Sequence, residues 1–520
     1  MHPDASTVAR LLRRNRDAYA AKRAVVTDEG AITHADLEVE SRSRAARLAA
    51  AGTGKGARIG LLAPNGIDWA VTAAAAMRIG AVLVPLSTLL RPPELEAQLR
   101  VAGVTHLVFA PSFRGRNYVD DLEVVAPGVV EATRAGRRHP NLPSLRRVWL
   151  TDCLPTACVD ESLVGALEDA VGPADDLVIL FTSGSRGTPK GTIHTHGSGL
   201  RAVTAGLETR CIGPDDRVYI PMPLFWSGGF ASGLLSALVA GATLLTEAVP
   251  EPGRTLELLV RERATLFRGW PDQAARLAAD PRFESADLSC LGPASLPAVL
   301  PPAERPAPGA RANLFGMTET FGPYCGARLD RDLPEGKHGS CGQPFAGFEL
   351  RITDASTDGP SRSGTTGEVR VRGPNVMRAL AGRTRDATFD PDGFYPTGDL
   401  GALDGDGYLW YRGRVDDMFK VRGATVYPAE VEAALRQISG VREAHVTNVA
   451  ATDGTDAVGA LVVTALPLEQ LVAGARGRLS TFKVPTRWVV TGSAADVPLT
   501  ATSKVDLDAL RGLLDEGTRA

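Results

Sequence analysis

Hydrophobic and polar residues follow two alternating patterns along the first 110 residues of the chain. Residues 35–51 have the spacing of an amphipathic helix, with Leu37, Ala45 and Leu48 set among polar neighbours. Short apolar runs predict buried strands, and the stretches between them have helical composition. We expect strands at 58–63, 81–85 and 106–110, with helices at 69–78 and 93–101 between them. This alternation predicts parallel sheets joined by crossover helices.

The alternation returns in the middle of the chain and then changes character. Apolar runs predict strands at 177–181, 217–221, 242–247 and 266–267. From about residue 364 the pattern consists of short β segments separated by glycine turns. These segments lie at 367–371, 407–411 and 418–421. They predict a small β-subdomain.

A smaller unit is expected after residue 414. Residues 430–438 place Val431, Leu435 and Ile438 on one helical face. Two strands and a further helix follow, at 445–449, 458–463 and 468–479. This is the pattern of an α+β domain of about 100 residues, which is a common domain size.

Composition agrees with a folded chain of more than one unit. Its 520 residues exceed one ordinary compact domain, and 44% hydrophobic with 22% charged residues are globular values. We predict an α/β fold with a large N-terminal domain, residues 1–413, and a small C-terminal α+β domain, residues 414–520. The large domain would hold mixed and parallel sheets flanked by helices, together with the small β-subdomain.

Charge and cysteine usage exclude several classes of function. The formal net charge is −3, and no run of five like charges appears, so we expect no nucleic-acid partner and no basic membrane patch. The six cysteines contain no CxxC pair, which argues against a disulfide frame or a zinc site. The N-terminus continues into an Arg-rich stretch at 10–16 without the apolar core of a signal peptide. Arg78 and Gly80 interrupt the longest apolar run, so we expect no membrane span and a cytoplasmic protein.

A phosphate-binding loop is the strongest chemical signal in the sequence. The apolar run LVILF at 177–181 leads directly into TSGSRGTPKG at 182–191. Glycines allow close backbone approach to a polyphosphate, hydroxyl groups donate hydrogen bonds, and Lys190 offsets negative charge. Pro189 stands where a Walker A loop requires glycine, so this is a different kind of loop. The alternative is a flexible surface turn after a strand.

This loop resembles the signature TSG(T/S)TGxPKG of the adenylate-forming superfamily, which contains acyl-CoA synthetases, peptide-synthetase adenylation domains and luciferases; Arg186 departs from it. Three further segments are similar to motifs of that family: FGMTET at 315–320, YPTGD at 395–399 and GRVDDMFK at 413–420. The resemblance covers essentially the whole chain. It implies a nucleotide site that includes Thr182, Ser183, Gly184, Ser185, Gly187, Thr188, Lys190, Phe315, Gly316, Met317, Thr318, Asp399 and Arg414.

Glu319 and Thr318 are the catalytic candidates of the second motif. A carboxylate beside a triphosphate is a natural ligand of Mg²⁺, which prefers oxygen donors and bridges phosphates. By the resemblance, Thr318 contacts the α-phosphate and Phe315 stacks on adenine. The alternative for Glu319 is an acidic residue on the solvated face of a helix start.

Asp399 and Arg414 are expected at the ribose. An aspartate can accept both ribose hydroxyls, although it also favours turns for local reasons. The resemblance adds Arg414 at the ribose, Asp416 as the hinge on which the small, mobile C-terminal domain swings, and Gly423 at the coenzyme A tunnel. The alternative is an exposed charged linker.

Lys504 is the third catalytic candidate. It lies in PLTATSKVD at 498–506, at the place of the family's C-terminal catalytic lysine, with Ser503 in place of the usual glycine. A lysine suits that role because negative charge builds on the carboxylate, the α-phosphate and the leaving pyrophosphate together. The alternative is a surface lysine near the end of the chain.

The substrate pocket is expected around the segment PLFWSGG at 223–229. Trp226 replaces the histidine that similar family segments carry, and the glycines leave a slot. The expected pocket contains no obvious aspartate that could bind an α-amino group, and apolar walls suit an aryl, alicyclic or medium-chain acid. The expected walls are Phe225, Trp226, Gly229, Gly292, Pro293 and Tyr324.

His194 and His196 have strand spacing, so they would point the same way and could suggest a metal site. No third ligand is evident nearby in the sequence, and we expect both to be packing residues.

The resemblance implies a reaction in two steps, with ATP, Mg²⁺ and coenzyme A. A carboxylate would attack the α-phosphorus of ATP, giving acyl-AMP and pyrophosphate, and coenzyme A would then take the acyl group. The alternatives are transfer to a carrier protein or an amine, and activation of a small oxyanion such as nitrite for N–N bond formation. A non-catalytic nucleotide-binding regulator and a metal-dependent hydrolase are more distant alternatives. Whether the partner is a second copy in a homodimer or a carrier protein stays open.

Overall fold

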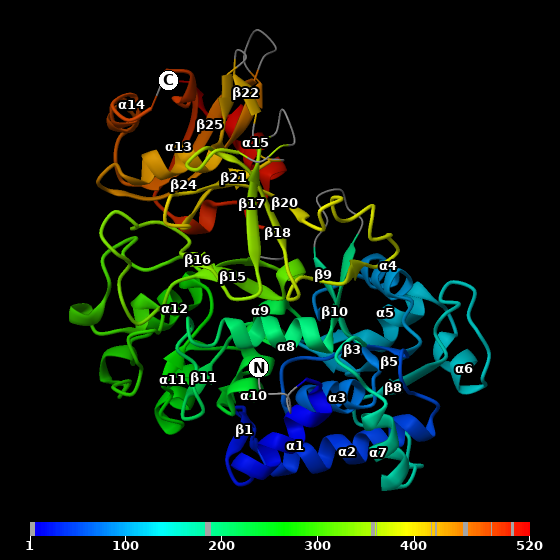
Figure 1. Ribbon diagram of the computed structural model, residues 1–520. Helices are drawn as coiled ribbons and strands as arrows, with labels where there is room; N and C mark the ends of the chain where they lie inside the picture. The colour runs from blue at the N-terminus through cyan, green and yellow to red at the C-terminus, as the bar shows by residue number, and fades with distance from the viewer. Residues whose placement is uncertain are drawn as a thin grey trace. The chain divides into compact units, whose positions relative to one another are not determined.

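The computed structural model of the chain describes residues 6–182, 189–354, 359, 361–415, 417, 419–421, 424–450, 456–479, 481–500 and 504–519 (Figure 1). The chain forms two compact units. The first contains Met1–Glu349 and Val371–Tyr395, and the second contains Leu350–Arg370 and Pro396–Ala520. The division predicted at residues 413 and 414, with a moving C-terminal domain, stays a prediction.

A seven-stranded sheet forms one half of the first unit. Its strands β3, β4, β5, β8 and β9 are parallel to their neighbours among one another, while β10 runs antiparallel to β9 and to β19. The order is β19 (Ala379–Leu380), β10 (Lys190–Thr195), β9 (Asp176–Thr182), β4 (Val82–Pro85), β3 (Arg58–Leu62), β5 (His106–Phe109), β8 (Arg147–Leu150). Runs such as VLVP are buried throughout, as expected for strands covered on both faces.

A five-stranded sheet forms the other half. β13, β11, β12 and β1 are parallel, and β2 closes the edge in the antiparallel sense. The order is β13 (Leu266–Phe267), β11 (Arg217–Tyr219), β12 (Thr243–Leu245), β1 (Arg23–Val26), β2 (Ala31–Thr33). The first unit also holds a hairpin, β6 (Ser112–Phe113) with β7 (Arg116–Asn117), and a three-stranded sheet, β14 (Phe315–Met317), β15 (Gly322–Gly326), β16 (Gln343–Pro344).

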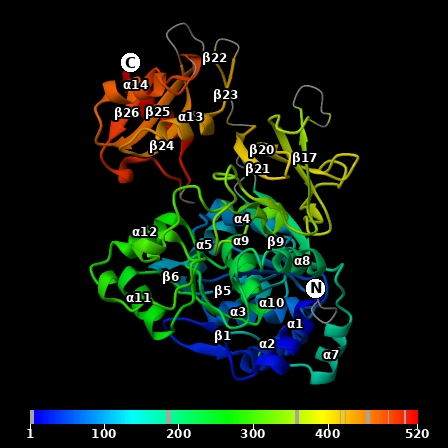
Figure 2. The ribbon, with the colours of Figure 1, turned by 60° about the vertical axis from the view of Figure 1, so that its left-hand side comes forward.

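Helices of the first unit connect and cover these sheets, and α1, α2 and α3 pack on one another (Figures 1 and 2). They are α1 (Val8–Tyr19), α2 (His34–Ala50), α3 (Ile67–Arg78), α4 (Pro92–Ala102), α5 (Tyr118–Val125), α6 (Val129–Arg134), α7 (Glu161–Asp169), α8 (His196–Ala205), α9 (Ser227–Gly229), α10 (Ser236–Ala240), α11 (Pro252–Arg261) and α12 (Pro271–Ala278). A π-helical segment, Phe230–Leu235, continues α9 into α10. π-helical turns are rare in proteins, and those that occur are often located at functional sites.

The second unit is built around two antiparallel-rich sheets. The first of these is a four-stranded sheet with the order β17 (Glu349–Thr353), β18 (Gly367–Arg372), β20 (Tyr395–Leu403), β21 (Leu409–Arg414). The terminal residues Glu349, 371–372 and Tyr395 of these strands are counted with the first unit. The small pair β22 (Phe419–Val421) and β23 (Ala424–Val426) follows. The last sheet and its helices are β24 (Val441–Ala450), β25 (Asp456–Thr464), β26 (Arg487–Thr491), β27 (Thr518–Arg519), α13 (Pro428–Arg436), α14 (Leu468–Arg476) and α15 (Leu507–Asp515).

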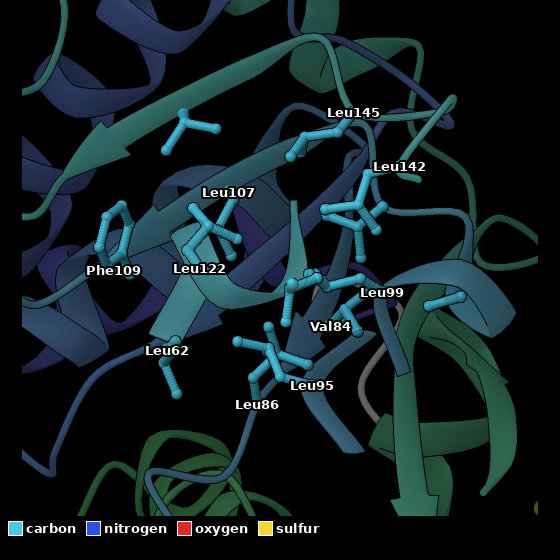
Figure 3. Packing of buried hydrophobic residues seen from close by; sticks show 14 of the residues in the cluster. Leu62, Val84, Leu86, Leu95, Leu99, Leu107, Phe109, Leu122, Leu142 and Leu145 are labelled. Carbon is cyan, nitrogen blue, oxygen red and sulfur yellow. The ribbon is translucent and has the colours of Figure 1, made fainter. Parts of the chain in front are cut away.

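Buried side chains fix each sheet against its helices. In the first unit, leucines of α4 and α5 pack on strands β3, β4 and β5, as Figure 3 shows for Leu99 near Val84 and for Leu122 near Leu107. In the second unit, α13 and α14 pack their apolar faces on β24 and β25. Burial of this kind contributes roughly 1.5–3 kcal/mol for each large apolar side chain.

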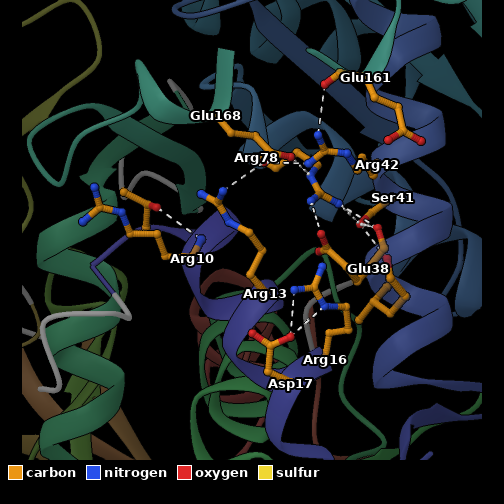
Figure 4. Close-up of polar contacts among 12 residues, drawn as sticks. Arg10, Arg13, Arg16, Asp17, Glu38, Ser41, Arg42, Arg78, Glu161 and Glu168 are labelled. Atoms are coloured by element: carbon orange, nitrogen blue, oxygen red, sulfur yellow. Dashed lines mark hydrogen bonds and ion pairs between the residues drawn. The ribbon is translucent and has the colours of Figure 1, made fainter. Parts of the chain in front are cut away.

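A buried ion cluster ties the N-terminal helices together (Figure 4). The guanidinium of Arg78 is fully buried and donates to Glu168 at 2.6 Å, to Glu38 at 2.8 Å and to the Ser41 hydroxyl at 2.7 Å. A buried guanidinium is tolerated only when its charge and donors are met in this way. The cluster therefore joins α2, α3 and α7 at a defined register.

The α/β fold predicted from the sequence is confirmed. β3 ends at Leu62, one residue before the expected end, and α2 covers residues 34–50 where 35–51 were expected. Among the described residues, no helix is both long and apolar enough to cross a membrane.

Candidate active site

The phosphate-loop motif joins two paired strands of the first unit. β9 ends at Thr182, β10 begins at Lys190, and these two residues are antiparallel partners. Gly191 packs so closely that an added Cβ would lie 2.9 Å from Ile179 and 3.1 Å from Ala381. The predicted phosphate contacts Ser183, Gly184, Ser185, Gly187 and Thr188 lie outside the described residues. Lys190 is described, and its side chain is half-buried.

The motif FGMTET forms a tight turn that buries Glu319. β14 leads into a 3-10 turn, Thr318–Thr320, and the Glu319 side chain is 5% exposed. The Tyr395 hydroxyl donates to Glu319 Oε1 at 3.1 Å, and the Met377 amide donates to the Glu319 carbonyl at 2.8 Å. Gly316 is required here because a Cβ would lie 2.3 Å from the Gly322 carbonyl oxygen. The turn therefore holds a carboxylate at a fixed position, and its predicted solvated alternative does not apply.

His194 supports the same turn from β10. Its ring is fully buried, and Nε2 lies 2.8 Å from the Thr318 carbonyl oxygen. Burial lowers the pKa of His194 from 6.5 to about 4, so the ring is neutral at pH 7 and Nε2 carries the donated proton. The ring also lies 4.6 Å from the Phe321 ring, centroid to centroid. His194 is a positioning residue for Thr318, a role that the sequence did not predict.

His196 has a different environment from His194. β10 ends at Thr195, and His196 is the first residue of α8, so strand alternation does not relate the two rings. His196 Nδ1 accepts from the Val8 amide at 3.3 Å, and burial lowers the pKa of His196 to about 4. The prediction that both side chains point the same way rested on a strand that stops between them. Their expected role as packing residues agrees with this burial.

Phe315 and Tyr324 connect the predicted adenine site to the predicted acyl pocket. They face each other across β14 and β15, with ring centroids 5.5 Å apart and an interplanar angle of 69°. Tyr324 is fully buried and also packs on Phe348. Edge-to-face pairs of this kind hold aromatic walls at defined angles.

The segment at 222–229 carries the other aromatic pair. Phe225 and Trp226 have ring centroids 5.6 Å apart and an interplanar angle of 83°. Gly229 ends α9 directly before the π-helical segment, and a Cβ there would lie 2.1 Å from the Pro223 carbonyl oxygen, so only glycine fits. Asn65 fixes this segment: its Oδ1 accepts from the Leu224 amide at 2.7 Å, and its Nδ2 donates to the Met222 carbonyl at 3.1 Å. Asn65 is a supporting residue that local sequence patterns do not reveal.

Gly292 and Pro293 follow a loop held to the edge of the five-stranded sheet. The Gly292 amide donates to the Thr265 carbonyl at 2.7 Å, and Arg311 donates to the Pro293 carbonyl at 2.6 Å. Pro293 is exposed and Gly292 half-buried. Their assignment as pocket walls stays a prediction.

Asp399 and Arg414 pair within the second unit. They are direct partners in the β20–β21 ladder, and Arg414 Nη1 donates to Asp399 Oδ1 at 2.8 Å and to the Thr397 carbonyl at 3.0 Å. Asp399 is 7% exposed, and burial raises its pKa while the Arg414 charge opposes that rise. The glycine before it, Gly398, has φ +71°, which lets the chain turn at the TGD motif.

Lys504 of the second unit is joined to Thr500 by two hydrogen bonds. The Thr500 amide donates to the Lys504 carbonyl at 2.7 Å, and the Lys504 amide donates to Thr500 Oγ1 at 3.3 Å. The Lys504 side chain is exposed. The predicted hinge Asp416 and the predicted tunnel residue Gly423 lie outside the described residues.

Oxygen donors fit Mg²⁺ better than a transition metal at this site. Within the described part of the chain, no three His, Cys, Asp or Glu side chains form a cluster able to hold a metal ion. Glu319 offers a buried carboxylate held by a hydroxyl group. Such a single carboxylate suits Mg²⁺, which retains waters and takes its other ligands from phosphates.

The chain matches the family of AMP-binding enzymes over residues 12–380. It therefore belongs to that family, as the four motifs predicted. Feruloyl-CoA synthase from an Amycolatopsis species is 34% identical over 467 residues, covering 88% of this chain and 89% of that protein. The 3-[(3aS,4S,7aS)-7a-methyl-1,5-dioxo-octahydro-1H-inden-4-yl]propanoyl:CoA ligase of Mycobacterium tuberculosis is 32% identical over 519 residues, covering 94% and 95%. The solved structure of the amide bond synthetase McbA from Marinactinospora thermotolerans superposes with a TM-score of 0.78 at 28% identity, covering 98% and 99%.

These matches define the reaction class. The chain is an AMP-forming acid–thiol ligase: it activates a carboxylic acid with ATP, releases pyrophosphate, and passes the acyl group to coenzyme A.

Proposed function

We propose that the acid is aryl or alicyclic. The observation that carries this proposal is the set of rigid aromatic side chains among the predicted pocket walls: Phe225 packs edge-on against Trp226, and Tyr324 packs edge-on against Phe315 of the predicted adenine site. Flat, apolar walls of this kind bind a ring better than a flexible chain, because the ring loses less conformational freedom on binding. Two similar proteins are named for ring-bearing acids, one aromatic and one bicyclic, which supports the proposal.

In the first step, the carboxylate oxygen forms a bond to the α-phosphorus of ATP, and the bond from that phosphorus to the bridging oxygen breaks. Pyrophosphate leaves with the electron pair. We propose that Lys190 offsets charge on the leaving phosphates and that Thr318 donates to an α-phosphate oxygen. Mg²⁺ bound through Glu319 would neutralise phosphate charge. Lys504 would neutralise the charge that develops during this step.

In the second step, the thiol sulfur of coenzyme A attacks the acyl carbon of acyl-AMP. The bond between that carbon and the AMP oxygen breaks, AMP leaves, and the thiol proton goes to solvent. The mixed anhydride makes this attack feasible because AMP is a far better leaving group than the oxygen of a free carboxylate. We propose that Asp399 holds the ribose in both steps, with its orientation set by Arg414.

An amine is a second candidate acceptor, favoured by the similarity to an amide bond synthetase over nearly the whole chain. A carrier protein, a homodimeric state and a location in the cytoplasm remain predictions.

Pyrophosphate release across a panel of acids tests the proposal. The panel should contain cinnamic, benzoic, alicyclic, straight medium-chain and α-amino acids, each assayed with ATP, with coenzyme A, and with a primary amine in its place. We expect ring-bearing acids to give the highest kcat/KM and a CoA thioester as product. A preference of more than tenfold for a straight-chain or amino acid would overturn the substrate class, and amide without thioester would overturn the acceptor.

A further inference from the structure

A cavity of about 380 Å³ opens in the first unit, and none of its lining residues belongs to the predicted nucleotide or acyl site. Its walls come from the first turns of α8, from the segment that follows β18, and from the loop before β20. Its volume is within the range of small-molecule sites. Four arginines line it: Arg201, Arg372, Arg378 and Arg385.

Two of these arginines are neutralised by carboxylates outside the cavity lining. Arg378 forms an ion pair with Asp176, at 2.7 Å to Oδ1 and 2.8 Å to Oδ2. Arg372 makes a two-pronged contact with Glu349, at 2.7 and 3.0 Å. These pairs shape the walls and leave little net charge.

The other two arginines, Arg201 and Arg385, have no carboxylate within ion-pair distance among the described residues. Arg201 donates to the Pro374 carbonyl at 2.7 Å, and its Nε is buried without a hydrogen-bond partner. Arg385 stacks at 4.3 Å over the Phe389 ring, and the one hydrogen bond that its guanidinium makes to a described residue is a 3.5 Å contact to the Arg378 carbonyl. The cavity therefore presents two guanidinium groups that no carboxylate of the described residues neutralises.

The remaining groups at the cavity modify this charge without cancelling it. Asp392 is the acidic residue in the lining and opposes an anion. The α8 end adds little, because Ser198 N already donates to Thr195 Oγ1 at 3.0 Å and Gly197 N to the Pro173 carbonyl at 2.7 Å. Selectivity for an anion would therefore rest on the two arginines.

We propose that this cavity binds a small phosphate monoester, at a site separate from the one that binds ATP. Guanidinium groups from two different elements suit a phosphate, whose tetrahedral oxygens can accept from both at once, better than a planar carboxylate. A backbone hydrogen bond links the cavity wall to the candidate active site, because the Met377 amide donates to the Glu319 carbonyl.

Isothermal titration of the full chain with glycerol 3-phosphate tests the proposal, at an ionic strength held constant with chloride. We expect saturable binding that Arg201→Gln and Arg385→Gln each weaken about tenfold or more, since each removes charge-assisted hydrogen bonds. Arg254→Gln, on the exposed face of α11 and outside the cavity, is the matched control and should bind like the unchanged protein. Arg385 is exposed, so its substitution leaves the fold intact even if Arg201→Gln does not fold.

A second control separates the cavity from the nucleotide site. Lys190→Ala should retain the binding of glycerol 3-phosphate, because Lys190 does not line the cavity. The proposal is overturned if the unchanged protein shows no saturable binding up to about 20 mM ligand, an affinity weaker than about −2.3 kcal/mol. Binding that Lys190→Ala abolishes and both arginine variants retain would also overturn it.

Discussion

Replacing His194 by phenylalanine separates two effects of one buried ring. The ring donates to the Thr318 carbonyl at 2.8 Å and packs 4.6 Å from the Phe321 ring. Phenylalanine keeps the packing and removes the donor, which leaves the Thr318 carbonyl with one hydrogen bond, from the Phe321 amide at 3.0 Å. We expect a loss of about 0.5–1.5 kcal/mol in the free energy of unfolding at pH 7.5.

The same substitution also removes the pH-dependent contribution of His194 to the free energy of unfolding. The pKa of His194 is lowered from 6.5 to about 4 by burial, so the unfolded chain binds this proton more tightly than the folded chain. The stabilisation that the neutral ring provides is present above pH 6.5 and is lost as the pH falls from 6.5 towards 4. At pH 5 this costs the unchanged protein about 2 kcal/mol, and His194→Phe escapes that cost.

The stability of the unchanged protein relative to His194→Phe should therefore fall by about 2 kcal/mol between pH 7.5 and pH 5, so that the variant becomes the more stable of the two at pH 5. Urea unfolding followed by tryptophan fluorescence measures this difference at the two pH values. The same unfolding transition is compared in the unchanged protein and in His194→Phe. A histidine NMR titration, with His194→Phe used to assign the signal, measures the pKa directly. If the difference in stability does not change with pH, or if the His194 signal titrates near 6.5, His194 is not held neutral by burial.

Four further substitutions test the site. Glu319→Gln should lower kcat for pyrophosphate release about a hundredfold and weaken the dependence on Mg²⁺, while Glu335→Gln, an exposed control, should not; equal rates would remove Glu319 from the site. Gly229→Ala should lower the free energy of unfolding by about 1–3 kcal/mol, because its Cβ would meet the Pro223 carbonyl. The control Gly233→Ala, whose Cβ would meet its nearest atoms at 3.5 Å, should be nearly neutral in urea unfolding. Similar losses in both variants would show that the close approach at Gly229 is not what requires glycine. Arg414→Lys should raise the KM for ATP about tenfold, because lysine cannot reproduce the planar fork, and an unchanged KM would count against a ribose role. Lys504→Ala should slow pyrophosphate release about a hundredfold and spare thioester formation from supplied acyl-AMP; loss of both half-reactions would point to a folding defect.

The sequence predicts the sheets of the first unit well because their strands are buried on both faces. Runs such as RIGLL at β3 and HLVF at β5 are continuous apolar segments, and no competing helical period is present. The helix α1 was not predicted. Its arginines dominate the composition, yet Val8, Leu11 and Leu12 form a buried face, and Arg13 lies 3.8 Å from Glu168 of the buried cluster.

The sequence motifs predicted the residues of the candidate site, but they did not predict the residues that hold those side chains in place. Motif residues such as Glu319 and Asp399 are close in sequence to the glycines that shape their turns. The groups that hold them come from distant segments: Tyr395 contacts Glu319 across 76 residues, and Asn65 contacts Leu224 across 159. Periodicity carries no information about such contacts, because they depend on how elements pack in three dimensions.

The exchange of ³²P-pyrophosphate into ATP measures acid activation by itself, because it requires reversible formation of an acyl-adenylate and no acceptor. We expect rapid exchange that depends on a ring-bearing carboxylic acid and on Mg²⁺, that occurs without coenzyme A, and that Lys504→Ala reduces about a hundredfold. If no acid class of the panel stimulates exchange, this chain does not form an acyl-adenylate.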